Sequence, residues 1–125
     1  MNARSEAGIV SHVWAGFARQ EIIGWWRSRG SVMLDIPAES FAERSDMTGR
    51  LVWESMPGNL VIRGLLDVRG GNPLLKVVTR AASAEEWERF QHPRMPLVEE
   101  PLFGIFPHAH SAWNTGRDGG QVELF

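Results

Sequence analysis

The residue pair with the clearest metal-ligand chemistry is His108 and His110, which are separated by one alanine. Alternate residues of a strand lie on the same face, so both imidazoles would be available to one metal ion. A third ligand would have to come from His12, from His92 or from a carboxylate, and no spacing selects among them. Because two histidines in a proline-flanked loop are usually ordinary loop residues, we expect no metal and no other cofactor.

Carboxylates and arginines are the other residue types that could support catalysis. Glu85, Glu86 and Glu88, and the pair Glu99 and Glu100, lie where charged runs are usually solvated. Four arginines could gather beside His92 or His110, as in a small ribonuclease: Arg63, Arg69, Arg80 and Arg94. The chain has no cysteine, no nucleophile elbow and no phosphate-binding loop, so we predict no catalytic residues and no enzyme.

Residues 121–125, Gln-Val-Glu-Leu-Phe, follow a glycine-rich run at 116–120 and end in two large apolar residues. Leaving Leu124 and Phe125 in water forgoes burial worth about 1.5–3 kcal/mol each. A pocket on another protein would bury them. The alternative is a terminus that folds back on its own chain, as a late edge strand.

This segment resembles the short linear motif by which bacterial proteins bind the β sliding clamp of the replisome. In that motif a Leu-Phe pair fills an apolar subsite and a glutamine hydrogen-bonds in a second one. Gln121, Val122, Leu124 and Phe125 match its four constrained positions, with valine where leucine is commoner. The resemblance covers five residues of 125. It implies a clamp-binding toxin, phage-type inhibitor or accessory factor of DNA replication or repair, with a possible antitoxin or regulator as a second partner.

Composition limits the other functions. A chain of 125 residues with 43% hydrophobic residues and six tryptophans can form one domain with a real core. The net charge of −2 argues against binding to nucleic acid by bulk electrostatics, so we expect no direct nucleic-acid partner. Two alternatives stay open: a small RNA-binding or ribonuclease-type toxin with an Arg/His surface, and a ligand-binding domain whose tail match is accidental.

The sequence predicts neither a signal peptide nor a membrane span. The N-terminal residues show no continuous apolar run typical of a signal peptide. No stretch approaches the roughly 20 apolar residues that a membrane span needs. We therefore expect a cytoplasmic protein without a membrane partner.

Residues 6–29 show helical spacing of apolar side chains, including Trp14 and Phe17, and predict a long N-terminal helix. Ser5 is a suitable N-cap, and Gly30 is a suitable residue to end the helix. Trp25 and Trp26 lie near its end, where adjacent tryptophans usually cap a core rather than stack on a ligand.

The middle of the chain predicts strands separated by short turns, hence an antiparallel β-meander. The predicted strands are residues 31–36, 50–55, 60–68 and 73–81. For residues 38–47 the sequence is compatible with either a short helix or a loop. Gly64 lies within a predicted strand and indicates a bulge or close packing by the long helix.

Ser83 and Glu86 form a capping-box pattern, which predicts a second short helix ending near Gln91, with Trp87 and Phe90 facing the sheet. The sequence as a whole predicts an α+β fold, with the long helix packed on the meander. We expect one domain at residues 1–113 and a flexible tail at 114–125 that carries the linear motif.

Overall fold

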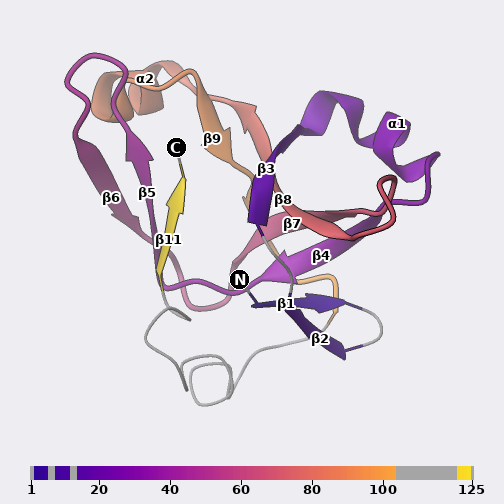
Figure 1. The fold of residues 1–125 in the computed structure, drawn as a ribbon. Coiled ribbons are helices and arrows are strands. Elements are labelled where there is room, and N and C mark those ends of the chain that lie inside the picture. The colour runs from indigo at the N-terminus through magenta and orange to yellow at the C-terminus, as the bar shows by residue number, and fades with distance from the viewer. Residues whose placement is uncertain (1, 6–7, 12–13, 104–120, 125) are drawn as a thin grey trace.

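A computed structural model describes residues 2–5, 8–11, 14–103 and 121–124, which form two β-sheets and short helical segments (Figure 1). The strands of the larger sheet are β1 (Asn2–Ser5), β2 (Gly8–Ser11), β3 (Trp14–Arg19), β4 (Val32–Ile36), β7 (Val61–Asp67), β8 (Leu74–Ala81), β9 (Arg94–Pro96) and β10 (Val98–Glu99). The strands of the smaller sheet are β5 (Ser40–Arg44), β6 (Leu51–Ser55) and β11 (Gln121–Leu124). The helical segments are η1 (Gln20–Ile22), α1 (Ile23–Arg27) and α2 (Ala84–Phe90).

The larger sheet runs in the order β2-β1-β4-β7-β8-β3, with β10 added to β7 and β9 added to β8. Its pairs are antiparallel except for β3 and β8, which are parallel. The smaller sheet has the order β11-β5-β6, with β5 and β6 antiparallel and β5 and β11 parallel.

The prediction of a long N-terminal helix is wrong. The described part of residues 6–29 contains β2, β3, η1 and a helix of only five residues, α1. Gly16 has φ +88, which no right-handed helix accommodates, and the register between β3 and β8 shifts at this point. Trp14 and Phe17 therefore lie in a strand, where Trp14 is half-buried and Phe17 is exposed.

The predicted meander is also wrong, although its strands are placed correctly. β7 and β8 pair through the turn at residues 68–73 as expected, but β6 pairs with β5 instead of β7. Residues 40–44, which the sequence left between helix and loop, form β5. The prediction of an α+β fold built from a long helix and a meander is therefore wrong, and the described residues form mainly β-sheet.

The capping box at Ser83 is confirmed. The Ser83 hydroxyl accepts from the Glu86 amide at 3.2 Å, and the Glu86 carboxylate accepts from the Ser83 amide at 2.9 Å. The helix α2 ends at Phe90, and its C-cap residue, Gln91, adopts the left-handed conformation. Of the two aromatic residues expected to face the sheet, Phe90 is buried and Trp87 is largely exposed.

One hydrophobic core joins the two sheets. The Phe41 ring of β5 stacks on the Phe90 ring of α2 with centroids 6.1 Å apart, and both pack with residues of β4 and β7. Gly64 belongs to this packing, because an added Cβ would lie 2.7 Å from the Ile36 Cδ1 atom. A second, smaller cluster under α1 contains Ala18, Trp26, Leu65 and Val78.

A buried ionic network crosses the larger sheet at Arg63. Its guanidinium donates to Asp35 at 2.5 Å, to Glu99 at 2.6 Å and to the Glu100 carbonyl at 2.9 Å. Asp35 in turn accepts from the backbone amides of residues 102 and 103. Arg63 thus ties β4 and β7 to the segment at 99–103.

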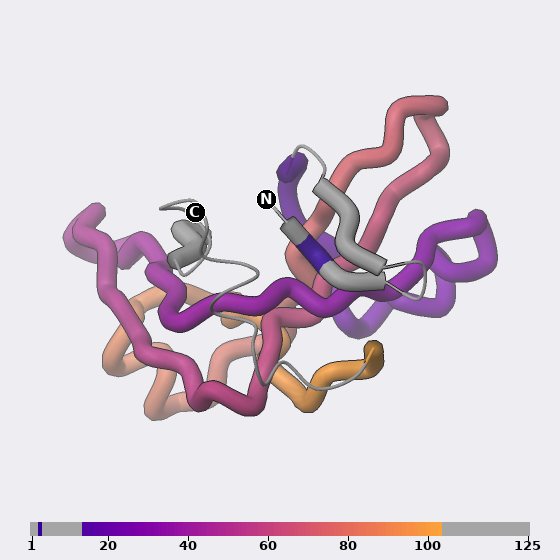
Figure 2. The backbone as a smooth tube through the Cα atoms, turned by 90° about the horizontal axis from the view of Figure 1, so that it is seen from below, coloured from indigo at the N-terminus to yellow at the C-terminus, as the bar shows by residue number. Residues whose placement is uncertain are grey.

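Figures 1 and 2 show two ends of the molecule: the smaller sheet and α2 lie at one end, and α1 with the β7–β8 turn lies at the other. Within the described ranges, no helix is long and apolar enough to cross a membrane.

Candidate functional site

The strand β11 contains most of the predicted clamp-binding residues. It pairs in parallel with β5, in a register that places Gln121 beside Ser40 and Leu124 beside Glu43. Figure 1 shows this strand, in yellow, alongside β5. Gln121, Val122 and Leu124 therefore lie together in one extended segment, whereas Phe125 lies outside the described residues.

The flexible tail expected from the sequence is not found at residues 121–124, whose backbone matches the fold-back alternative. The boundary predicted at 113/114 lies outside the described residues and stays a prediction. β11 is the last strand of its sheet, with β5 as its neighbour in the described part of the chain. Such an edge strand presents extended backbone to a binding partner, and pockets on that partner can then select side chains.

Glu43 is an unexpected buried carboxyl in β5, directly beside β11. Its side chain is only 2% exposed, its Oε2 lies 3.5 Å from the His92 Nδ1, and its Oε1 has no hydrogen-bond partner among the described residues. Burial raises the pKa of Glu43 to about 8, and the charge of Asp46 adds to this shift. Glu43 is therefore mostly protonated at neutral pH, and no sequence signal distinguished it from a solvated glutamate.

The turn that follows β5 is fixed to the end of α2. The Ser45 hydroxyl donates to the Gln91 side chain at 2.6 Å, and the Asp46 amide donates to the Gln91 carbonyl at 2.8 Å. Ser45 also accepts from the amides of residues 47 and 48. These bonds hold β5 in place independently of β11.

A cavity of about 360 Å³ lies between β6 and α2. Its apolar lining includes Phe41, Met56, Phe90 and Met95. Two ion pairs lie in its wall: Arg80 with Glu86 at 2.6 Å, and Arg89 with Glu54. These four charges are matched and Glu85 is the one other charged residue of the lining, so the cavity offers mainly shape and apolar surface to a ligand.

The arginines of the ribonuclease alternative do not form one basic surface. Each of the four has its own carboxylate: Arg63 pairs with Asp35 and Glu99, Arg69 with Asp67, Arg80 with Glu86, and Arg94 with Glu21. His92 contacts Glu43, and His12, His108 and His110 lie outside the described residues. Where side chains are described, no group of three potential ligands could hold a metal ion.

Sequence reasoning missed a cluster of cations around Trp25 and Trp26. The tryptophan pair was visible in the sequence, but Arg69, which contacts it, comes from the β7–β8 turn, and Lys76 comes from β8. Only the antiparallel pairing of β7 and β8 under α1 brings them together.

Comparisons of the chain with protein-family models, with curated proteins and with solved structures find no match, so its function must be argued from its own residues.

Proposed function

We propose that the protein binds the bacterial β sliding clamp through Gln121, Val122, Leu124 and Phe125, and that it modulates, chiefly by inhibition, DNA replication or repair. The observation that carries this proposal is the match of residues 121–125 to the clamp-binding motif. The extended, edge-strand backbone of residues 121–124 supports it, because linear motifs bind in extended form.

Binding requires the segment to leave β5, since a pocket has to enclose the residues that it recognises. The parallel pairing with β5 spans four residues, and each backbone hydrogen bond contributes a net of about 0.5–1.5 kcal/mol. The affinity of the whole protein is reduced by the fraction of molecules in which β11 is released. A peptide of residues 116–125 does not carry this cost and should bind more tightly than the intact chain.

The expected affinity follows from the apolar area. Burial of Leu124 and Phe125 offers about 3–6 kcal/mol together, and a satisfied Gln121 side chain adds about 0.5–1.5 kcal/mol. Association and ordering of the segment oppose this gain. We expect micromolar binding of the peptide, or about −8 kcal/mol at most.

Occupation of the clamp pocket would exclude other proteins that use the same pocket, including the replicative polymerase. Such a protein needs no catalytic residue and no cofactor. It would work in the cytoplasm, where an antitoxin or regulator that holds β11 on β5 could control it. The toxin, phage-type inhibitor and accessory factor remain three forms of the same proposal.

The test is a titration of purified clamp with the full chain, with the peptide 116–125, and with three single variants. Phe125→Ala should weaken binding more than tenfold, because it removes the largest apolar group of the motif. Gln121→Ala should weaken binding less. Glu123→Ala is the matched control, because it changes the unconstrained position of the same strand.

Two outcomes would reject the proposal: no saturable binding of either peptide or chain at tens of micromolar, or equal binding by Phe125→Ala and wild type. Binding by the peptide but not by the chain would retain the motif and reject its release from β5 in the intact protein.

A further inference from the structure

A basic-aromatic cluster, formed by Trp25, Trp26, Arg29, Arg69 and Lys76, lies at the end of the molecule opposite β11. Trp26 is 8% exposed and packs on Leu65 and Val78. Trp25 is 41% exposed, and its ring meets the Trp26 ring edge-on with centroids 5.1 Å apart. One tryptophan thus anchors the cluster in the core and the other faces solvent.

The cations of the cluster lie over the indole rings. The Arg29 guanidinium lies 3.9 Å from the Trp25 ring centroid, and its Nη1 is fixed by a 3.0 Å bond to the Trp25 carbonyl. The Arg69 guanidinium lies 4.5 Å from the Trp26 centroid and 5.1 Å from that of Trp25. The Lys76 ammonium is 5.6 Å from the Trp26 centroid. The side chains are therefore ordered before any partner arrives.

Positive charge exceeds negative charge in this region. Asp67 is the carboxylate of the cluster; it accepts from Arg69 at 3.0 and 3.1 Å and lies 4.0 Å from the Lys76 ammonium. Neither Arg27, at the end of α1, nor Arg29 pairs with a carboxylate in the described part of the chain. The cluster thus contains three cations and one carboxylate, although the whole chain has a net charge of −2.

We propose that the basic-aromatic cluster binds single-stranded nucleic acid. Phosphates would pair with Arg29 and with the N–H groups of Arg69 that do not bond to Asp67, and an unstacked base would lie on the guanidinium plane of Arg29. Lys76 would contribute only its charge, because its ammonium donates to the Ala15 carbonyl at 2.8 Å. A guanidinium held by an indole presents a planar face and free N–H groups together. A single strand uses both, because its base faces are open, whereas a duplex hides those faces and a lipid headgroup has none.

The proposal corrects the expectation from net charge, which averages over the whole molecule and cannot reveal a local excess. It is also independent of clamp binding, since Figure 1 places α1 and β11 at different ends of the molecule.

The experiment is an anisotropy titration of fluorescein-labelled oligothymidylate with the full chain at 50 and 150 mM salt. With two phosphate contacts, the slope of log affinity against log salt should be about −1.4. Arg29→Ala should weaken binding at least fivefold and reduce the slope by about 0.7. Arg29→Lys keeps the positive charge but loses the planar guanidinium, so it should weaken binding and leave the salt dependence of the affinity unchanged.

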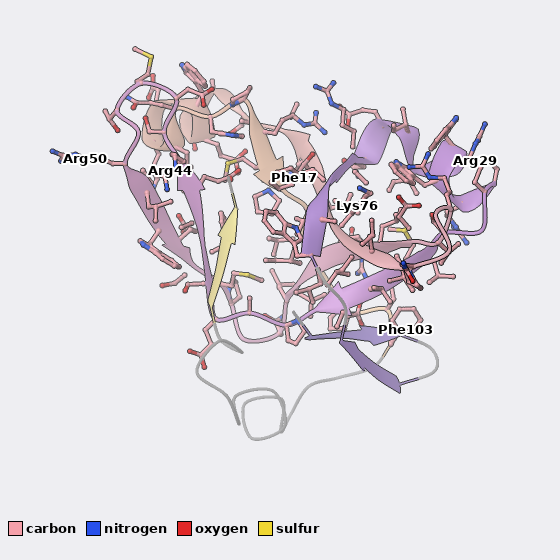
Figure 3. The ribbon with its side chains drawn as sticks, in the orientation of Figure 1. Phe17, Arg29, Arg44, Arg50, Lys76 and Phe103 are labelled. Carbon is pink, nitrogen blue, oxygen red and sulfur yellow. The ribbon has the colours of Figure 1, made fainter. Side chains whose placement is uncertain are left out.

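Arg50→Ala is the matched control, because Arg50 is an exposed arginine at the other end of the molecule (Figure 3). It should change the affinity less than twofold. Near-ultraviolet circular dichroism will show whether each variant keeps its tryptophan packing. If Arg29→Ala loses that packing, the affinity of Arg29→Lys tests the proposal instead.

Three outcomes would overturn the proposal. The first is no binding at 100 µM protein in 50 mM salt. The second is an equal loss in Arg29→Ala and Arg50→Ala, which would indicate diffuse charge attraction. The third is binding to vesicles with 30% phosphatidylglycerol but not to the oligonucleotide, which would indicate a membrane surface instead.

Discussion

The two ends of this molecule present recognition groups in opposite ways. At one end, β11 offers extended backbone that is already paired with β5. At the other, the basic-aromatic cluster offers side chains that are already held in place, among them Arg29, which pairs with no carboxylate in the described part of the chain. The first surface has to break its hydrogen bonds with β5 before it can bind a partner, whereas the second can bind without a conformational change.

This difference determines which conditions would control binding at each end. A segment that must be released binds with an affinity that depends on how firmly its own sheet holds it, so anything that alters β5 alters function. A preformed charged surface instead responds to ionic strength, through the screening of its charges. The two proposed activities can thus be separated by experiment.

The largest expected effect is on stability and concerns Arg63, in the larger sheet. Arg63→Met should lower the free energy of unfolding by about 3–5 kcal/mol, because it leaves Asp35 buried without its cation. Urea denaturation measures this change. Because the sheets share one core, both ends should unfold in the same transition.

Arg80→Ala is the control for Arg63→Met, since its ion pair with Glu86 is partly exposed and should contribute no more than about 1 kcal/mol. A cost below about 1 kcal/mol for Arg63→Met would show that the larger sheet does not depend on its buried network.

The next effect concerns Glu43, at the β11 end. The unfolded chain loses this proton near pH 4.5, while the folded chain keeps it up to about pH 8. The folded state therefore binds more protons in this range, and stability falls as the pH rises. Glu43→Gln removes this dependence, so it should be more stable than wild type by about 4 kcal/mol at pH 8.5 and nearly equal to it at pH 4.5.

Glu86→Gln is the opposite case and serves as the control. Its hydrogen bonds with Arg80 lower the pKa of Glu86 to about 2, so its contribution is present above pH 4.5 and is lost only at lower pH. The stability difference between this variant and wild type should stay constant from pH 5 to 8.5. If Glu43→Gln behaves in the same way, Glu43 is ionised in the folded protein.

The smallest expected effects test whether the two ends are independent. Phe125→Ala should leave the affinity for single-stranded DNA within twofold of wild type, and Arg29→Ala should leave clamp binding equally unaffected. In the double variant, the free-energy changes should add to within about 0.5 kcal/mol. A coupling above about 1 kcal/mol, measured by calorimetric titration of each partner, would show that the ends communicate.

Local signals in the sequence predicted local structure well. The capping box at Ser83 requires only residues three apart, and the turn between β7 and β8 requires only its own glycines and asparagine. The strand β5 was missed because its pattern contains Glu43, a charged residue type that the fold buries.

Predictions failed where distant partners decide the outcome. Residues 14–19 have helical spacing, but pairing with β8 some 60 residues away makes them a strand. In the same way, the motif at 121–125 was visible by residue type, whereas its pairing with a strand 80 residues earlier was only an open alternative. The basic-aromatic cluster needs three separate segments, so no local pattern could reveal it.

The pairing of β11 with β5 has one further consequence, for self-association. β5 has β6 on one side and β11 on the other, so release of β11 uncovers a row of unpaired amides and carbonyls along β5. Open edges of this kind recruit strands from other molecules, and the obvious donor is β11 of a second copy. In addition to serving an outside partner, β11 therefore protects the edge of β5. Each time β11 is released, β5 can pair with β11 of a second copy, which would join two chains by a strand swap.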